Sequence, residues 1–160
     1  TGSNVEPATL ARLAEISNIV GVKEASGNMS QIADICRRVP SDFLVLSGDD
    51  ALALPVMSIG GKGVISVVSN EVPSEMVQLV ESAERGDLSA ARRWHQALIP
   101  LMLANFVEAN PIPVKFAMAA MGLCEEVYRL PMVPPGPAAR QQILDVLKDF
   151  GLPITPEVRA

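Results

Sequence analysis

Short β-branched runs alternate with helix-forming segments along the first half of the chain, and this alternation constrains the fold more than any other feature. Three runs are predicted as buried strands, at residues 19–23, 43–46 and 64–68. Helices are predicted before and between them, at residues 7–16, 29–39 and 51–59. Short connections of this kind require parallel strands joined by right-handed crossovers. Residues 1–86, which also include a predicted helix at 75–85, are therefore expected to form an α/β unit.

The rest of the chain, residues 87–160, has only helix-type patterns and is predicted to be a separate helical domain. Its helices are expected at residues 87–108, 114–122 and 137–150, with an extended segment at 131–135. Pro100 should bend the first of these helices. Residues 97–103 are apolar on nearly every side, so that part is expected to be buried all round.

Charge and composition exclude several classes of protein. A net charge of −5 leaves no basic patch to neutralise phosphates, so nucleic acid is not an expected partner. The apolar stretch at residues 98–104 is about a third of the roughly 20 residues that a membrane span needs. No signal peptide is apparent, and Cys36 and Cys124 are predicted to be reduced core thiols of a cytoplasmic protein. The absence of an initial Met suggests that the sequence begins inside a longer protein.

Lys23 is the strongest candidate for chemistry. Strand alternation places it on the same face as Gly21 and Ala25, which leave free volume beside it. Burial there would lower the pKa of its ammonium from about 10.4 and supply a neutral amine for attack on a carbonyl group. The alternative is a lysine whose ammonium only pairs with Glu24 or Asp49.

Other motifs have structural explanations that are preferred to chemical ones. Residues 47–50, Ser-Gly-Asp-Asp, are more typical of a helix cap than of a metal site. Residues 60–63, Gly-Gly-Lys-Gly, precede a strand and lack the spacing of a phosphate-binding loop, so they are predicted to be a turn. His95 is the only histidine, and no nucleophile elbow accompanies it, which argues against a catalytic triad.

Several motifs together resemble the dihydrodipicolinate synthase family, across the whole chain and in order. Residues 21–28, Gly-Val-Lys-Glu-Ala-Ser-Gly-Asn, are similar to the family's Schiff-base lysine motif. Residues 46–51 and 60–67 are similar to its next strand end and its last barrel strand. Residues 110–115 and 129–131 are similar to its C-terminal helical domain.

This resemblance implies the C-terminal portion of a (β/α)₈ TIM barrel, with three parallel strands, followed by a small all-helical domain. It implies that Lys23 condenses with pyruvate and that the resulting enamine attacks aspartate semialdehyde, in the pathway to diaminopimelate and lysine. Gly48 and Ile65 match positions whose backbone lines the pyruvate pocket. The iminium nitrogen is the electron sink, so the resemblance implies no metal and no organic cofactor. A homo-oligomer, dimer or tetramer, is also implied.

Two alternatives remain open. Sibling enzymes, the N-acetylneuraminate lyases and keto-deoxy sugar acid aldolases, share the lysine chemistry, although residues 24–28 favour the synthase. A complete barrel needs about 250 residues. The 160 residues present would lack the family's proton-relaying hydroxyls, the arginine that holds the semialdehyde carboxylate and the lysine-inhibitor site. The chain alone could therefore be a non-catalytic fragment or assembly module.

Overall fold

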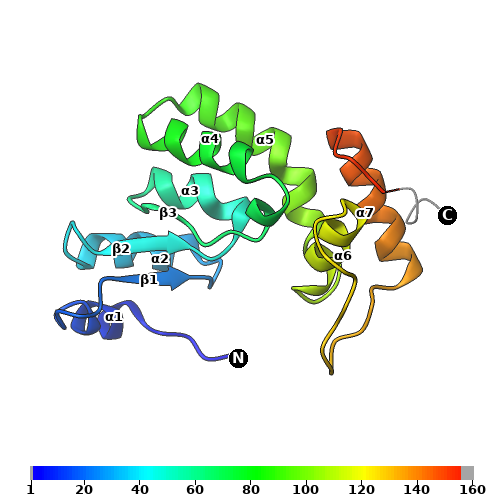
Figure 1. Cartoon of the computed structure of the whole chain (residues 1–160). Coiled ribbons are helices and arrows are strands. Elements are labelled where there is room, and N and C mark those ends of the chain that lie inside the picture. Colours follow the sequence, from blue (N-terminus) through cyan, green and yellow to red (C-terminus); the bar gives the residue numbers. More distant parts are fainter. Residues whose placement is uncertain (1, 156–160) are drawn as a thin grey trace. The chain divides into compact units, whose positions relative to one another are not determined.

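Three short strands form one parallel sheet in the computed structural model, which describes residues 2–155 (Figure 1). The strands are β1 (Gly21–Glu24), β2 (Leu44–Ser47) and β3 (Gly63–Val64), in that order across the sheet. Lys23 lies opposite Leu46, and Leu46 lies opposite Gly63. The predicted α/β arrangement with three parallel strands is confirmed.

The third strand is shorter than predicted. Only Gly63 and Val64 pair with β2, and the chain then enters a 3₁₀ turn, η2 (Val68–Asn70). β2 itself ends at Ser47, opposite Val64, so the pairing between β2 and β3 stops there. A β-branched sequence forms a strand only where another strand can pair with it, so the prediction of a strand over 64–68 is wrong beyond Val64.

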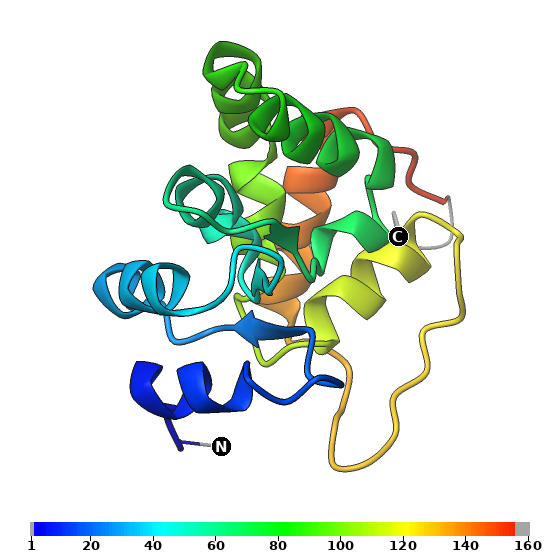
Figure 2. The ribbon, with the colours of Figure 1, turned by 90° about the vertical axis from the view of Figure 1, so that its left-hand side faces the viewer.

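Three helices cover one face of this sheet (Figure 2). They are α1 (Pro7–Leu13), α2 (Met29–Arg38) and α3 (Ala53–Ser58), the last preceded by the 3₁₀ turn η1 (Asp50–Leu52). The apolar side chains between sheet and helices form a closed core, made by Leu10, Ile32, Ile35, Phe43, Val45 and Val56. This core fixes the sheet against its helices, so the opposite face of the strands is left for other contacts.

The chain divides into two compact units. Among the described residues, the first comprises 2–66 and 77–95, and the second comprises 67–76 and 96–155. Two helices, α4 (Pro73–Glu84) and α5 (Leu88–Ala104), pass from one unit into the other. The boundary predicted between residues 86 and 87 falls inside the first unit, and the division into a barrel part and a helical domain stays a prediction.

Helices α6 (Ile112–Ala120) and α7 (Pro137–Phe150) supply most of the core of the second unit, including Phe116 and Leu147. α7 has the limits that the sequence predicts, and Gly151 ends it in the left-handed conformation at φ 84°. The predicted burial of residues 97–103 on all sides is wrong. The Leu103 side chain is 58% exposed because α5 buries only the stripe that carries Leu98, Leu101 and Met102.

The two cysteines differ from the prediction of core thiols. Both are free, but Cys124 is exposed and Cys36 is only partly buried. Cys124 lies beyond the end of α6 rather than within a helix, which explains its exposure. Across residues 2–155, no helix has both the length and the apolarity that a membrane crossing requires.

Candidate active site

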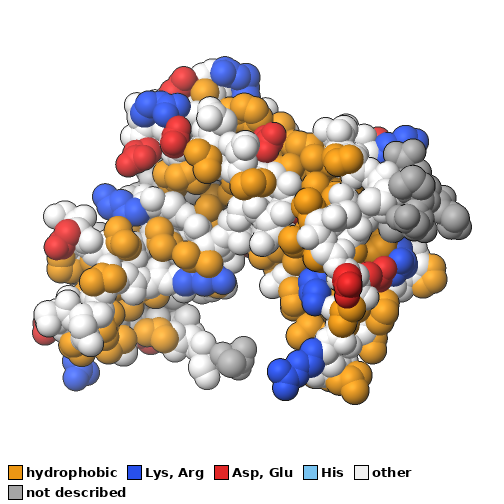
Figure 3. All heavy atoms as spheres, viewed as in Figure 1, with side chains coloured by type: hydrophobic (Ala, Val, Ile, Leu, Met, Phe, Trp, Pro, Cys, Tyr) orange, Lys and Arg blue, Asp and Glu red, His pale blue; other side chains and the backbone are white. Residues whose placement is uncertain are grey.

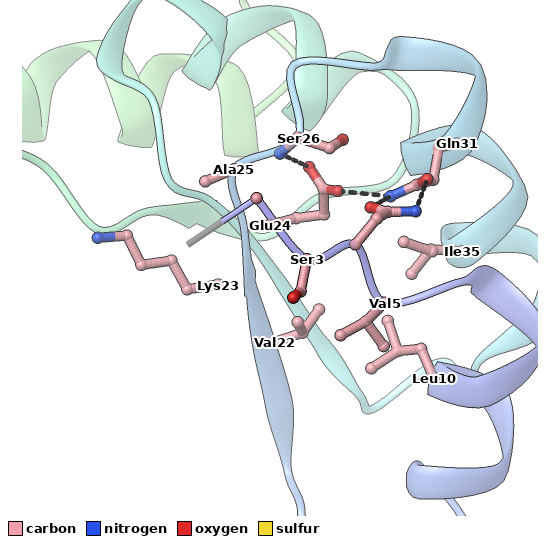
Figure 4. A pocket seen from close by; sticks show the side chains of 12 residues that line it. Ser3, Val5, Leu10, Val22, Lys23, Glu24, Ala25, Ser26, Gln31 and Ile35 are labelled. Atoms are coloured by element: carbon pink, nitrogen blue, oxygen red, sulfur yellow. Dashed lines mark hydrogen bonds between the residues drawn. The ribbon is translucent and has the colours of Figure 1, made fainter.

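Lys23 occupies the third position of β1, next to the carboxyl end of the strand. Because side chains alternate along a strand, Lys23 and Glu24 point to opposite faces of the sheet. Figure 4 shows the lysine side chain extending away from Glu24. Glu24 faces the helices and is buried, whereas Lys23 lies on the face that these helices leave open.

The Lys23 side chain is exposed, so the expectation of a buried lysine is wrong for the described chain. Helices α1, α2 and α3 pack against the other face of the sheet, and the amine on the open face is in contact with solvent. The structural alternative also fails, since Lys23 makes no ion pair within residues 2–155. Asp49 instead accepts a hydrogen bond from the Ala51 amide at 2.9 Å. The lysine amine is therefore not engaged by a carboxylate.

Gly48 packs directly against the segment that carries Lys23. A Cβ atom at position 48 would lie 2.7 Å from the Ala25 Cβ, 3.1 Å from the Glu24 carbonyl oxygen and 3.1 Å from the Lys23 Cε. The Gly48 amide also donates to the Glu24 carbonyl at 2.6 Å. Only glycine lets the two strand ends approach this closely, so Gly48 fixes the backbone beside the lysine and leaves room for its side chain.

Ile65 follows the last residue of β3, just as Gly48 follows the last residue of β2. Its amide donates to the Ser47 carbonyl at 2.8 Å, and its side chain is 45% exposed. Lys23, Gly48 and Ile65 thus all lie at the carboxyl ends of neighbouring parallel strands, which is where sites form in α/β barrels. An amine beside close-packed backbone amides is suited to forming an imine with a carbonyl compound.

A cavity of about 390 Å³ lies at the exposed edge of β1. Its walls come from the N-terminal arm, which we define as residues 2–6, and from β1, the loop after it, α1 and α2. Lys23, Glu24 and Ser26 line it together with Ser3 and Asn4 of the arm. Figure 4 shows Ser3 and Val5 turned towards the same cavity as Val22 and Leu10. The arm is therefore part of the surroundings of the lysine strand.

The chain is similar to proteins of a known family. The model of the dihydrodipicolinate synthetase family matches residues 1–150. The chain belongs to this family. The 4-hydroxy-tetrahydrodipicolinate synthase of Koribacter versatilis is 50% identical over 152 residues, which is 95% of this chain and 51% of that protein.

Solved structures of the dihydrodipicolinate synthetase family share the fold. The crystal structure of dihydrodipicolinate synthase from Aquifex aeolicus superposes with a TM-score of 0.93 at 42% identity, covering 95% of this chain and 52% of the other. The chloride-inhibited synthase from Acinetobacter baumannii, solved in complex with pyruvate, has a TM-score of 0.92 at 36% identity and coverages of 96% and 53%. The chain thus spans about half the length of the relatives it matches, and it corresponds to a portion of their barrel.

The remaining sequence candidates have structural roles in this family member. Asp49 is the cap of η1, as the cap interpretation of residues 47–50 predicts. The glycines at residues 60–63 form a turn into β3, and a Cβ at Gly61 would collide with the Val56 Cγ1. His95 is partly buried, and this burial lowers the pKa of its imidazole. No group of metal-binding side chains assembles anywhere in the described part of the chain.

Sequence reasoning missed a polar cluster on the other face of β1. The Glu24 carboxylate accepts hydrogen bonds from the Ser26 amide and from the Gln31 side chain, each at 3.1 Å. Gln31 in turn pairs with Asn4 of the arm. A partial signal was available, since Asn28 and Gln31 have the spacing of a capping box. Nothing in the sequence indicated that Gln31 would reach Glu24 and the arm instead.

Proposed function

We propose that this chain forms part of the barrel of a 4-hydroxy-tetrahydrodipicolinate synthase in which Lys23 is the Schiff-base residue. The observation that carries the proposal is the position of Lys23: at the carboxyl end of a parallel strand, free of any carboxylate within the described residues, and against Gly48. The relative solved with pyruvate supports a 2-keto acid as the first substrate.

The proposed reaction begins when the neutral amine of Lys23 attacks the keto carbon of pyruvate and water leaves, so that a C=N bond replaces C=O. A proton then leaves the methyl group, and its electrons move into the iminium nitrogen to give an enamine. The enamine carbon attacks the aldehyde carbon of aspartate semialdehyde, whose oxygen takes up a proton. The amino group of the same substrate closes the ring and releases Lys23.

The residues around Lys23 would position the keto acid rather than exchange protons with it. Gly48 brings its backbone amide region to the side of the lysine without a side chain in the way. Ile65, at the end of β3, supplies an apolar wall next to Gly48. We propose that Gly48 and Ile65 line the pyruvate site and that no metal or organic cofactor takes part.

The direct test uses the complete barrel enzyme that contains this sequence. Incubation with pyruvate and borohydride should reduce the imine, and peptide mass spectrometry should find the adduct on Lys23. Lys23→Arg keeps the charge but loses the nucleophile, and Lys62→Arg is the matched control. A label on Lys62 or Lys115, or no label at all, would contradict the assignment.

The choice of acceptor needs a separate measurement. Glu24 to Asn28 favour the synthase over sibling aldolases, so we expect turnover of pyruvate with aspartate semialdehyde and little with sugar-derived aldehydes. A preference for N-acetylmannosamine or a glyceraldehyde would assign the chain to a sibling enzyme. We further propose that the complete enzyme is cytoplasmic and forms a homo-oligomer. Light scattering can measure the mass of that oligomer.

A further inference from the structure

Glu24 is a buried carboxylate on the strand that carries the reactive lysine. Its residue exposure is 7%, so its polar atoms need hydrogen-bond partners from the protein. The Ser26 amide donates to one carboxylate oxygen and the Gln31 Nε2 donates to the other, each at 3.1 Å. The carboxylate thus links the end of β1 to the loop after it and to the first turn of α2.

The link continues from Gln31 to the N-terminal arm through a paired set of amide hydrogen bonds. The Asn4 Nδ2 donates to the Gln31 Oε1 at 2.9 Å, and the Gln31 Nε2 donates to the Asn4 Oδ1 at 3.0 Å. This contact spans 27 positions in sequence, so it is tertiary rather than local. Gln31 therefore holds both the buried carboxylate and the arm, and the orientation of its amide is fixed by both (Figure 4).

The arm lies where it can shape the site. It lines the same cavity as Lys23, Glu24 and Ala25, beside β1, an edge strand of the described sheet. The arm has exposed side chains from Ser3 to Glu6 and no strand pairing of its own among the described residues. The Asn4–Gln31 pair joins the arm to α2 by side-chain hydrogen bonds, next to the strand that carries Lys23.

Lys23 itself is held by different interactions. Its backbone is in register with Leu46 of β2, and the Gly48 amide donates to the carbonyl of the adjacent Glu24. These are backbone contacts, so changing the Glu24 side chain leaves them in place. Loss of the carboxylate should release the arm while the lysine keeps its place in the sheet.

We propose that Glu24 is a positioning residue that, through Gln31 and Asn4, clamps the N-terminal arm beside Lys23 and so sets one wall of the site where the acceptor aldehyde meets the enamine. The inference rests on the proposed function. Glu24 acts through Gln31 and Asn4 rather than on the substrate in this assignment, because its two carboxylate oxygens accept hydrogen bonds from the Ser26 amide and the Gln31 side chain.

The sharpest variant is Glu24→Gln, which keeps the shape and removes the charge. The Ser26 amide and the Gln31 Nε2 are both donors. A glutamine at position 24 has one acceptor oxygen, so its own NH₂ group would face one of these donors. Gln31→Ala removes the hydrogen bonds of Gln31 to both Glu24 and Asn4, and Asn4→Ala removes only those between Asn4 and Gln31. Matched controls are Glu84→Gln and Gln78→Ala, both on exposed positions of α4.

Two measurements on the complete enzyme separate the steps. Borohydride trapping with saturating pyruvate reports imine formation on Lys23, and steady-state kinetics report the acceptor. We expect Glu24→Gln, Gln31→Ala and Asn4→Ala to form the trapped imine as the wild type does. Their KM for the acceptor should rise roughly 10- to 100-fold, because a misplacement on the order of 1 Å can cost a factor of 100. The double variant Asn4→Ala/Glu24→Gln should be no worse than the worse single variant, because the two share one link.

The outcomes distinguish this inference from the proposed function. If the wild type gives no adduct on Lys23, the proposed function fails first. If the wild type is labelled and the acceptor KM of Gln31→Ala and Asn4→Ala equals that of the controls, the clamp is refuted and the function stands. The clamp is also refuted if Glu24→Gln loses imine formation and acceptor turnover in equal proportion with a lowered melting temperature, since that pattern marks a purely structural residue.

Discussion

Gly48 determines how closely the ends of β1 and β2 approach each other. Its amide lies 2.6 Å from the Glu24 carbonyl, and a methyl group there would collide with the Ala25 Cβ at 2.7 Å. Flexible side chains can give way to a new methyl group, but the Glu24 carbonyl oxygen, at 3.1 Å, belongs to the strand backbone. The strand ends must therefore separate if any side chain is placed at position 48.

We predict that Gly48→Ala lowers the stability by about 1–3 kcal/mol, the usual cost of overpacking, and lowers kcat of the complete enzyme at least tenfold. Gly136→Ala is the control. It has an ordinary φ of −65°, and its new Cβ would lie 3.4 Å from the Glu108 Oε1. Denaturant unfolding and steady-state kinetics measure both effects. Equal behaviour of the two variants would show that the close approach at Gly48 has no role in catalysis.

Tyr128 lies in a partly buried polar cluster of the second unit. Burial, followed by the charge of Glu126, raises the pKa of its phenol to about 12. The Glu126 carboxylate is itself held by Arg140 at 2.5 and 3.0 Å, and Arg140 stacks 4.2 Å from the centroid of the Phe116 ring. Tyr128 is the only tyrosine in the sequence, so its titration can be observed without interference.

The expected pH dependence follows from the direction of that shift. The folded pKa lies above the ordinary value of about 10, so the folded state binds the proton more tightly than the unfolded state. The resulting stabilisation is fully present below pH 10 and is lost as the pH rises to about 12. Phenolate absorbance of the 160-residue chain should rise with a midpoint near pH 12, and Tyr128→Phe should remove the signal. A midpoint at pH 10 would contradict the partly buried placement of this side chain.

The sequence identified some residues of the candidate site and did not identify others. Lys23 and Gly48 belong to local motifs, so a continuous stretch of sequence was enough to place them at adjacent strand ends. The exposure of Lys23 was not foreseen, because it depends on walls that other segments would have to supply. The Glu24–Gln31–Asn4 link was missed for a related reason: it joins residues up to 27 positions apart through side chains of ordinary surface type.

Among the elements, α2 best illustrates a local signal with a measurable effect. Asn28 has the extended conformation of an N-cap at φ −89° and ψ 95°, and its Oδ1 accepts from the Gln31 amide at 3.1 Å. The cap was predicted from the sequence because asparagine before an apolar periodic segment satisfies a free helix amide. The same turn of α2 carries the side chain that holds the arm.

We predict that Asn28→Ala lowers the free energy of unfolding by about 1 kcal/mol, the typical cost of losing a cap. Asn28→Asp should keep most of the stability, since it retains the accepting oxygen and places a negative charge at a helix N-terminus. Asn18→Ala, at an exposed position before β1, is the control. Urea titration provides the comparison, and equal midpoints for the two alanine variants would count against the cap.

Helices and strands were predicted correctly where nearby residues set their limits, and incorrectly where contacts with distant segments decide. The limits of α7 were correct because Pro137 begins the helix and Gly151 ends it. Residues 65–68 were expected to extend β3, but the register between β2 and β3 ends at Ser47 and Val64, and strand formation depends on pairing with another strand. The exposure of Leu103 on α5 has a similar origin, since burial depends on what packs against a helix and not on its own composition.

At the scale of the whole molecule, the 160 residues correspond to about half of a family member. The described sheet has three parallel strands, whereas a complete (β/α)₈ barrel has eight. We therefore predict that the purified 160-residue chain lacks normal synthase activity. General acid–base catalysis raises the reaction rate by about 10²–10⁴-fold, and it needs catalytic groups beyond those on this face of the sheet. Addition of the rest of the barrel in trans should restore turnover, whereas full activity of the chain alone, with its mass verified, would disprove the prediction.

The same open sheet predicts how the chain behaves in solution. β1 and β3 are both edge strands in the described sheet, so each presents a row of backbone groups without a neighbouring strand. Figure 3 shows apolar side chains exposed on one face of the molecule. Exposed apolar side chains at the strands and their ends include Val20 by 66%, Leu44 by 41% and Ile65 by 45%. Exposed strand edges beside apolar side chains are a template for pairing with a second chain.

We predict that the 160-residue chain, where it stays in solution, associates through this sheet rather than remaining a monomer. At roughly 25 cal/mol per Å², a few hundred Å² of exposed apolar surface corresponds to several kcal/mol. That is comparable with the 5–15 kcal/mol or so that stabilises a whole domain, so association that covers the surface should outweigh the entropy of bringing two chains together.

Light scattering after size exclusion measures the mass, and hydrogen exchange on β1, β2 and β3 shows which segments become protected as the concentration rises. Charged substitutions at the exposed positions, Val20→Lys and Leu44→Lys, should shift the equilibrium towards the monomer, while Val77→Lys on an exposed position of α4 should not. A monomer at every concentration, with all three strands strongly protected, would mean that the open face of this sheet is satisfied within the single chain.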